Sequence, residues 1–562
     1  MEDEEIRIGV FICHCGTNIG GSVDVPAVVE YAKDLPNVVY VERNLYTCAD
    51  DGITAIKNAI KEHDLNRVIV ASCTPRTHEP LFRSTCEDAG LNKYLFEFVN
   101  IREHCSWVHM KDPEGATEKT KELVRMGVAR AAILEPQEEI KIDVEPSTMV
   151  IGGGIAGLTA AKNLANQGFD VYLVEKEAVL GGMLKNLYRL YPTGEDSLES
   201  IRPIIEAVEG HEKIKLFTSC ELKEIKGYIG NFDVTLLRGG EEINFKVGTI
   251  IVATGAMEFE PKGYYGYGKY DKIITQMQLE ALLKEGSLEK PDSVVMIQCV
   301  GAKGAEVTYC SRICCMVAIK NAMLIKEIHP DACIHILHND IQAYGAEYEE
   351  LYRKSREMGI RFIKYTPEKP PNVTMEGEKL KVEVYNELFG KQLTLGADLL
   401  VLSTPLLQHQ SGSEISKLLR VPLGKDKFFF EAHVKLRPVD FATDGIFLCG
   451  TAHGPAEVAE SVSQALAAAS GAGIPLSRGF VQVEAISVKV DPEACIGCGF
   501  CVDMCPYQAL SMVDGKLEII EALCKGCGTC VATCPTGALE QRHYQNNQIM
   551  SQIKAIFHPV IE

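Results

Sequence analysis

The sequence predicts an α/β protein of several domains that ends in a small α+β domain. Three observations support this fold class. Apolar, strand-like segments alternate with helical segments. A glycine-rich turn of the form G-x-G-x-x-G joins one such strand to a helix. Two runs of four cysteines follow one another near the C-terminus. With 562 residues the chain has room for about three to four domains.

The composition disfavours several functional classes. The chain carries 77 acidic and 57 basic side chains, a formal net charge of −20, which disfavours binding to nucleic acid or to an anionic membrane. No run approaches the roughly 18 consecutive apolar residues that a membrane span needs, and the acidic N-terminus is unlike a signal peptide. We therefore expect a cytoplasmic protein. In that compartment its 21 cysteines indicate metal or redox ligands, not disulfides.

Residues 1–140 are predicted to form an open α/β domain with a parallel sheet. The expected strands are Ile6–Ile12, Val38–Glu42, Arg67–Ala71 and Tyr94–Val99. The expected helices are Val25–Leu35, Gly52–His63, Glu79–Gly90 and Ala116–Ile133.

Five cysteines follow the strands of this domain: Cys13, Cys15, Cys48, Cys73 and Cys105. The carboxyl ends of parallel strands share one edge of a sheet, and ligands bind at that edge. We therefore expect a 4Fe–4S cluster held by Cys48, Cys73 and Cys105, together with Cys13 or Cys15. The alternative is that these residues are ordinary buried thiols, because no C-x2-C pair anchors the site.

Residues 145–261 and 403–480 are predicted to form one dinucleotide-binding domain. A strand at Thr148–Ile151 leads into the G-x-G-x-x-G turn and a helix, and the next strand, Asp170–Val174, ends at Glu175. Glycines let a pyrophosphate approach the helix N-terminus, and an acidic residue at this distance reaches the ribose hydroxyls. The candidate cofactor-binding residues are Gly152, Gly154, Ile155, Ala156, Gly157, Glu175, Lys176, Gly182, Met183, Ala253, Thr254, Gly255, Gly450 and Thr451.

Three further segments favour FAD over NAD as the dinucleotide. Gly181-Gly182, Thr249–Gly255 and Asp444–Gly450 resemble signatures of flavoproteins of the thioredoxin- and glutathione-reductase type, and a helix is expected at Pro455–Ala469. Thr451 departs from that pattern, because an aspartate usually follows the last glycine. The contact to the ribityl chain would differ accordingly.

Residues 262–402 are predicted to form a second, inserted Rossmann-like domain, as in that type of flavoprotein. Its first strand, Ser293–Ile297, is not followed by G-x-G-x-x-G, which makes NAD(P)H doubtful as the direct reductant. Four cysteines stand there instead: Cys299, Cys310, Cys314 and Cys315. Their spacing alone leaves open whether they are metal ligands or buried thiols.

Residues 485–540 are predicted to form a bacterial-type ferredoxin domain, followed by a tail at 541–562. The spacing C-x2-C-x2-C-x3-C-P occurs twice, and in such domains the fourth cysteine of each run ligates the other cluster. The expected ligands are Cys495, Cys498, Cys501 and Cys534 for one 4Fe–4S cluster, and Cys524, Cys527, Cys530 and Cys505 for the other. Structural zinc is a weak alternative, since zinc ribbons use two C-x2-C pairs.

The order of these parts resembles the A subunit of heterodisulfide reductase from methanogens and related organisms. The segments Cys13–Asn18, Ala71–Arg76 and Arg102–His109 resemble N-terminal signatures of that family. The chain resembles a short form, because Leu190–Gly194 runs directly into a helix where many members insert a ferredoxin module. The resemblance implies a further 4Fe–4S cluster on the four cysteines of the inserted domain, close to the flavin. Lys320 follows Cys315 by five residues, about one and a half helical turns, and is the candidate catalytic residue that would hydrogen-bond the flavin; a solvent-facing lysine is the ordinary alternative.

For function, the resemblance implies electron bifurcation or confurcation between a two-electron donor, ferredoxin and a CoM-S-S-CoB-type disulfide that is reduced on partner subunits. The implied partners are B- and C-type subunits, ferredoxin, and a hydrogenase, formate dehydrogenase or deazaflavin-oxidising subunit for electron input, assembled as a dimer of heteromers. The alternative is a related FAD and iron–sulfur subunit that feeds an aromatic-ring reductase or a sulfur-oxidation complex.

Overall fold

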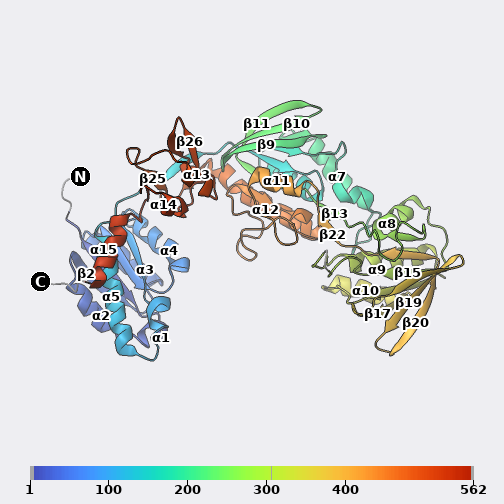
Figure 1. Ribbon diagram of the computed structural model, residues 1–562, viewed down its shortest axis with the longest axis horizontal. Coiled ribbons are helices and arrows are strands. Elements are labelled where there is room, and N and C mark those ends of the chain that lie inside the picture. The colour runs from blue at the N-terminus through green and yellow to red at the C-terminus, as the bar shows by residue number, and fades with distance from the viewer. Residues whose placement is uncertain (1–4, 305–306, 558–562) are drawn as a thin grey trace. The chain divides into compact units, whose positions relative to one another are not determined.

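The computed structural model describes residues 5–304 and 307–557 (Figure 1). The chain divides into two compact units, one formed by residues 1–141 with 482–562 and the other by residues 142–481. The first unit therefore joins segments from both ends of the chain. Among the described residues, no helix is both long enough and apolar enough to cross a membrane.

The N-terminal part of the first unit is a parallel sheet in the order β2-β1-β3-β4. Its strands are β1 (Ile8–Cys13), β2 (Val38–Asn44), β3 (Arg67–Ser72) and β4 (Phe96–Asn100). Helices α2 (Val25–Lys33) and α5 (Pro113–Ala131) pack on one face, and α3 (Asp50–Glu62) and α4 (Pro75–Asp88) on the other. The predicted strand–helix order of this domain is confirmed.

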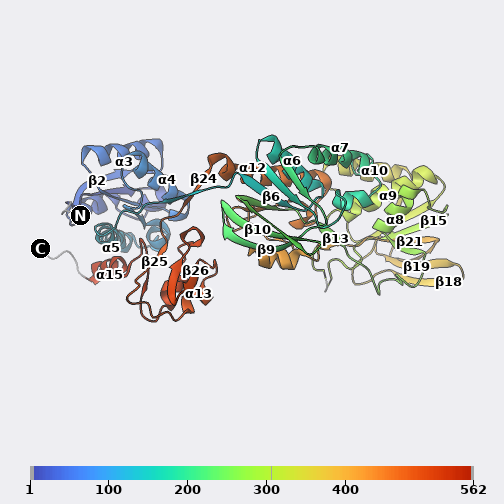
Figure 2. The same cartoon turned by 90° about the horizontal axis from the view of Figure 1, so that it is seen from above.

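The C-terminal part of the first unit is a small module with two antiparallel strand pairs (Figure 2). β25 (Val488–Val490) pairs with β28 (Leu539–Gln541), and β26 (Leu510–Val513) pairs with β27 (Lys516–Ile519). The short helices α13 (Phe500–Met504) and α14 (Thr529–Thr533) each follow a cysteine-rich loop.

The segment predicted as a tail is partly helical. Residues 546–557 form α15 (Asn546–Phe557), whereas 558–562 lie outside the described residues. Arg125 of α5 donates from Nε to the carbonyl oxygen of Ala555 at 2.7 Å. Buried Arg130 of the same helix donates to the carbonyl oxygen of His543 at 2.5 Å. The end of the chain therefore packs on a helix of the N-terminal domain.

The second unit contains two five-stranded parallel sheets of similar construction. The first has the order β23-β12-β6-β7-β8, with strands β6 (Ser147–Ile151), β7 (Asp170–Val174), β8 (Ile214–Phe217), β12 (Thr249–Val252) and β23 (Ile446–Leu448). Helices α6 (Ile155–Asn166), α7 (Ser197–Glu209) and α12 (Val458–Arg478) cover one face. A three-stranded antiparallel sheet covers the other: β9 (Glu221–Tyr228), β10 (Asn231–Arg238) and β11 (Glu241–Val247).

The second sheet is inserted between β12 and β23 and has the order β14-β21-β15-β16-β17. Its strands are β14 (Ile273–Thr275), β15 (Ser293–Ile297), β16 (Cys333–His338), β17 (Arg361–Lys364) and β21 (Leu399–Leu402). Helices α8 (Gln276–Glu285), α9 (Cys314–Ile328) and α10 (Ala346–Glu357) pack on one face. The antiparallel strands β18 (Asn372–Glu376), β19 (Lys379–Asn386) and β20 (Lys391–Ala397) pack on the other.

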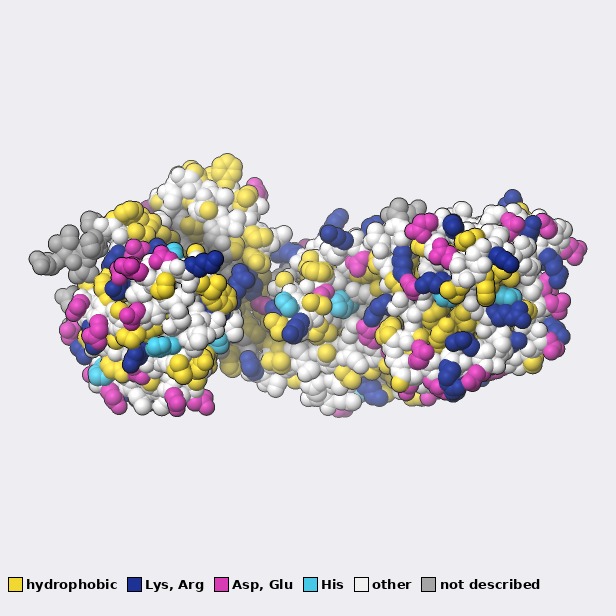
Figure 3. Space-filling view, turned by 90° about the horizontal axis from the view of Figure 1, so that it is seen from below, with side chains coloured by type: hydrophobic (Ala, Val, Ile, Leu, Met, Phe, Trp, Pro, Cys, Tyr) yellow, Lys and Arg dark blue, Asp and Glu magenta, His cyan; other side chains and the backbone are white. Residues whose placement is uncertain are grey.

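A short antiparallel pair, β13 (Ala256–Glu258) with β22 (Leu406–Gln408), carries the chain into the insert and back. The predicted fold class, α/β with an inserted second α/β domain and a C-terminal α+β module, is thus confirmed. On the face shown in Figure 3, basic and acidic side chains are interspersed over the second unit.

We predict that Arg67→Ala destabilises the first unit. Arg67 is buried at the start of β3, and its guanidinium donates to the carbonyl oxygens of Ala131 (3.0 Å) and Leu134 (2.8 Å) at the end of α5. Loss of these charged donors should cost about 3 kcal/mol of unfolding free energy, measured by denaturant unfolding and amide exchange of β3 and α5. Lys57→Ala, which removes an exposed ion pair with Asp88, should cost less than about 1 kcal/mol. Equal losses in the two variants would contradict the assignment.

Candidate functional site

The turn between β6 and α6 requires glycine at two positions. Gly152 has a φ of 112°, in the left-handed region that glycine tolerates. A Cβ on Gly152 would overlap the carbonyl oxygen of Ala253, and one on Gly157 would overlap the carbonyl oxygen of Gly152. The first turn of α6 therefore lies directly against the backbone of its own loop, as a dinucleotide-binding turn requires.

Glu175 at the end of β7 faces this turn. Its Oε2 accepts a hydrogen bond from the Gly153 amide at 2.6 Å, and its Oε1 accepts one from the Glu177 amide at 2.8 Å. The neighbouring Lys176 has its Nζ 2.9 Å from Nε2 of His409. The acidic side chain predicted from the sequence is thus fixed beside the glycine loop.

Two more segments close around the same turn. Gly182 has a φ of 54°, and a Cβ there would lie 2.9 Å from the Cα of Gly154. Gly450 follows β23 with a φ of 68°, its amide donates to Oε1 of Gln464 at 3.0 Å, and a Cβ there would lie 2.7 Å from the Cβ of Ala156. Gln464 on α12 was not foreseen from the sequence. Helix α12 also extends to Arg478, nine residues beyond the predicted end at Ala469.

The strand ends also leave a polar group for a ligand. Thr254, directly after β12, has a buried Oγ1 that finds no hydrogen-bond partner among residues 5–304 and 307–557. Thr451 lies beside it, with its Oγ1 3.7 Å from the position of a Cβ on Gly255. Glycine-lined space and an unpaired hydroxyl at the ends of β6, β12 and β23 fit a bound dinucleotide.

In the inserted domain, four cysteines gather at the carboxyl end of β15. Cys299 follows β15 with a φ of 62°, and α9 begins at Cys314, so that Cys314 and Cys315 occupy its first turn. Cys310 lies before the helix, and its Sγ accepts a hydrogen bond from the Arg312 amide at 3.3 Å. The expectation that the adjacent cysteines sit at a helix start agrees with this structure.

The thiols of this group repel one another as anions. Burial raises the pKa of Cys314 well above its usual value, and the three other thiols raise it further. Burial, opposed by a backbone hydrogen bond, also raises the pKa of Cys315 to about 12, with Cys299 and Cys310 contributing. Neighbouring thiolates that are partly or fully buried are stabilised by a bound cation, and such thiolates are the donor groups of an iron–sulfur site.

Lys320 lies further along α9 and is 6% exposed, so the alternative of a solvent-facing lysine is wrong. Its Nζ forms an ion pair with the buried Glu280 of α8 and donates to the carbonyl oxygen of Arg189 at 2.8 Å. Burial lowers the pKa of Lys320, and the carboxylate of Glu280 opposes that effect. Glu280 was missed at the sequence level because 40 residues separate it from its partner.

A second ion pair, also missed from the sequence, links the insert to the first sheet's domain. Arg312, two residues before α9, donates from Nη2 to both carboxylate oxygens of Glu460 at 3.0 Å and to the carbonyl oxygen of Pro455 at 2.6 Å. It anchors the loop of Cys310 against the start of α12.

In the first unit, four of the five predicted cysteines share one edge of the sheet. Cys13 ends β1, and its Sγ accepts hydrogen bonds from the amides of Cys15 (3.2 Å) and Thr47 (3.4 Å). Burial raises the pKa of Cys48, and so do the thiols of Cys13 and Cys15. Burial likewise raises the pKa of Cys73, where the same two thiols contribute and Arg102 opposes them.

Cys105, the fifth of the predicted ligands, lies apart from these four cysteines. It lies in a π-helical turn, η1 (Arg102–Ser106), that directs its side chain inward. Its thiol donates to the carbonyl oxygen of Ala116 at 3.1 Å and lies 3.3 Å from Oγ1 of Thr120, both on α5. Burial raises its pKa, and the smaller effects on it come from residues of α5.

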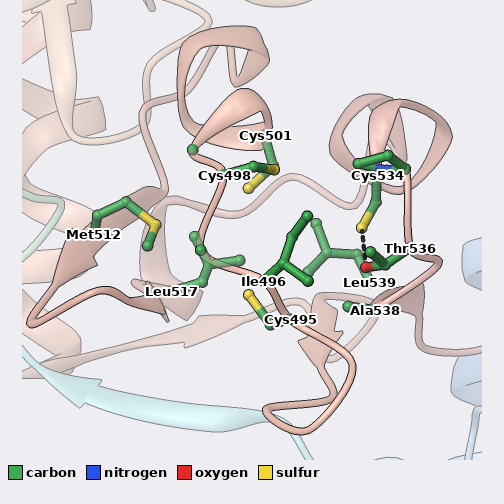
Figure 4. A pocket seen from close by; sticks show the side chains of 13 residues that line it. Cys495, Ile496, Cys498, Cys501, Met512, Leu517, Cys534, Thr536, Ala538 and Leu539 are labelled. Carbon is green, nitrogen blue, oxygen red and sulfur yellow. Dashed lines mark hydrogen bonds between the residues drawn. The ribbon is translucent and has the colours of Figure 1, made fainter.

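The C-terminal cysteines form two groups that cross between the runs. A pocket is lined by Cys495, Cys498 and Cys501 from the first run and by Cys534 from the second, together with apolar residues such as Ile496 (Figure 4). Burial raises the pKa of Cys501, with Cys498 and Cys534 adding to it. Burial raises that of Cys530 to about 11, with Cys524 and Cys505 adding to it. Each fourth cysteine thus lies with the opposite run.

Comparisons with protein families match two parts of the chain. Residues 146–308 match the family described as pyridine nucleotide-disulphide oxidoreductase, a flavoprotein fold that implies FAD. Residues 494–538 match the family described as 4Fe–4S dicluster domain. This match implies that the C-terminal domain holds two 4Fe–4S clusters.

Curated relatives align over nearly the whole chain. An iron-sulfur A subunit of the CoB–CoM heterodisulfide reductase of Methanopyrus kandleri is 41% identical and covers 100% of this chain and 99% of its own. The A subunit of the H(2):CoB-CoM heterodisulfide,ferredoxin reductase of Methanothermobacter marburgensis is 41% identical, covering 98% and 97%. The first alignment spans 667 positions against 562 residues here, so that relative carries residues that this chain lacks.

Among solved structures, two thioredoxin reductases align with the central region. That of Lactococcus lactis covers 59% of this chain and 99% of its own, with 18% identity and a TM-score of 0.43. That of T. acidophilum covers the same shares, with 17% identity and a TM-score of 0.41.

We predict that Gly157→Ala abolishes retention of FAD. The added Cβ would overlap the carbonyl oxygen of Gly152 and push α6 away from its loop. The measurement is the flavin-to-protein ratio after purification, with the melting temperature of the second unit. Gly454→Ala is the matched control, because a Cβ there meets nothing within 4 Å. Full flavin content in Gly157→Ala would show that this turn does not bind the cofactor.

Proposed function

Because this chain belongs to the family of heterodisulfide reductase A subunits, we propose that it distributes electrons between a two-electron donor, ferredoxin and a CoM-S-S-CoB-type disulfide. Its cofactors are FAD and the two 4Fe–4S clusters of the C-terminal domain. When bound, FAD exchanges electrons singly or in pairs, and the clusters carry single electrons. The disulfide is reduced on partner subunits of the B and C type.

The observation that carries this proposal is the four-cysteine group at the carboxyl end of β15. At this point of a nucleotide-binding sheet a glycine turn would bind NAD(P)H. Here the half-buried Cys299 and Cys310 and the buried Cys314 and Cys315 stand in place of that turn. These four cysteines would hold a 4Fe–4S cluster. The cluster would transfer single electrons at the position where a reductase of this fold accepts a hydride from NAD(P)H.

The residues proposed to hold FAD surround the β6–α6 turn. The glycine loop and first helical turn, Gly152 to Gly157, would receive the pyrophosphate at the N-terminus of α6. Glu175 and Lys176 would bind the ribose end. Gly182 and Met183, the strand-end residues Ala253 to Gly255, and Gly450 with Thr451 would line the remainder of the site.

Lys320 is proposed to hold a proton beside the flavin. Its Nζ donates to Arg189, which lies in the segment that follows Gly182, and its helix begins with the two adjacent cysteines. Lys320 thus contacts the segment that follows Gly182 and belongs to the helix that begins with two of the proposed cluster ligands. Glu280 keeps this ammonium paired in a buried site and can accept its proton.

The remaining site and partners extend the proposal. Cys13, Cys15, Cys48 and Cys73 would hold a cluster in the N-terminal domain. The names of relatives include dihydrogen and formate as electron sources, and ferredoxin as a second substrate. We propose that this chain likewise takes electrons from a partner that oxidises such a donor, within a dimer of heteromeric complexes in the cytoplasm.

We predict that Cys534→Ser and Cys495→Ser remove the same 4Fe–4S cluster. Both side chains line one pocket although they come from different runs. Each of these two variants should lose about four iron atoms and the same low-temperature EPR signal. The single variants Cys505→Ser and Cys524→Ser should both lose the other EPR signal. If Cys534→Ser shared its lost signal with Cys524→Ser, the clusters would instead be held within single runs.

The function is tested with the chain assembled with its B- and C-type subunits and an electron-input partner. Two molecules of a two-electron donor supply four electrons. Two of these electrons, with two protons, cleave the disulfide to two thiols, and the other two electrons reduce ferredoxin. We expect ferredoxin to be reduced only while the heterodisulfide is present. Replacing Cys314 and Cys315 by serine should abolish this coupled reduction, whereas Cys333→Ser, outside the group, should retain it. Ferredoxin reduction at an equal rate without disulfide would refute the proposal.

A further inference from the structure

Arg102 directs a positive charge at the cysteines of the N-terminal domain. It begins η1, directly beyond β4, and its Nη1 donates to the Sγ of Cys15 at 3.6 Å. Cys15 itself has a φ of 47°, and its amide donates to Cys13. Cys73 also lies close enough for the charge of Arg102 to act on its thiol. One guanidinium therefore acts on two of the four thiols.

The guanidinium is held in this orientation from several sides. Its Nε and Nη2 both donate to Oε1 of Glu103, at 3.2 and 2.7 Å. Its Cζ lies 4.6 Å from the ring centroid of Trp107. Oδ1 of Asn100 accepts hydrogen bonds from the amides of Arg102 (3.1 Å) and Glu103 (3.0 Å), which fixes the backbone. The side chain is 18% exposed, so solvent screens its charge only in part.

We propose that Arg102 is a positioning residue that raises the reduction potential of the N-terminal iron–sulfur site. This inference rests on the proposed cluster at Cys13, Cys15, Cys48 and Cys73. One-electron reduction adds a negative charge to such a site. A fixed cation stabilises the reduced form more than the oxidised form, and a hydrogen bond to a ligand sulfur acts in the same direction. Glu103 and Trp107 orient the guanidinium and thereby maintain the effect.

The geometry distinguishes this role from a general surface charge. Arg43 of β2 stands at the same end of the sheet, in register with Ile12 of β1, and offers the same charge. Its charge acts on His14. Replacing Arg43 therefore removes one positive charge near the site but leaves the hydrogen bond to Cys15 intact.

The test is an EPR-monitored potentiometric titration of the full-length, anaerobically purified chain. Cys73→Ser identifies the signal of the N-terminal cluster as the one that it loses, with about four iron atoms. Cys105→Ser should keep both this EPR signal and its iron atoms. In Arg102→Gln that signal should shift to a more negative midpoint potential, whereas Arg43→Gln should shift it less. Trp107→Leu, which keeps the guanidinium but removes its support, should give an intermediate shift.

Each outcome decides one point. If Cys73→Ser loses neither iron nor a signal, the proposed N-terminal cluster is wrong, whatever Arg102 does. If the cluster is present and Arg102→Gln leaves its potential unchanged, or shifts it no more than Arg43→Gln, the role of Arg102 is overturned. If Arg102→Gln loses the cluster, the midpoint potential of the N-terminal cluster is measured instead in Arg102→Lys and in Trp107→Leu. An unchanged midpoint potential in both of these variants would overturn the inference.

Discussion

Burying several thiols in one place is the constraint on which the rest of this structure depends. Thiolates at the ends of parallel strands repel one another and lose hydration, and both effects disfavour the charged form that binds iron. Cys314 and Cys315 show the extreme case, at the first turn of a buried helix. Nearby cations reduce this cost: Lys303 lowers the pKa of Cys299, and Arg102 lowers that of Cys73, each against the larger effect of burial.

The two sheets of the second unit show how one architecture serves two chemistries. Both have five parallel strands covered by helices on one face and a three-stranded antiparallel sheet on the other. In the first sheet, the loop after β6 is closed by glycine, which lets backbone approach backbone. In the second, the loop after β15 carries Cys299 and is anchored through Arg312 and Glu460. The two sheets thus share a plan of strands and covering layers but carry glycine in one loop and cysteine in the other.

Much of this arrangement could be predicted from the sequence because it depends on local spacing. Strand ends, the glycine turn and the repeated cysteine runs each follow from a few neighbouring residues. Cys105 could not be placed in this way: it follows a strand like the other cysteines, but the π-helical turn after β4 rotates its thiol toward α5. The burial of Lys320 depends on Glu280, and the helix at 546–557 depends on α5. Such features are set by partners distant in the chain, which spacing does not reveal.

The pairing of α15 with α5 has a consequence for the order of events during synthesis. Arg125 and Arg130 find their partners on residues more than 400 positions later in the chain. The first unit therefore stays incomplete on the ribosome until the last segment emerges, while residues 142–481 form a continuous unit that can fold earlier. Helix α5 of the N-terminal domain thus gains its last packing partner only after the whole flavin domain has been synthesised.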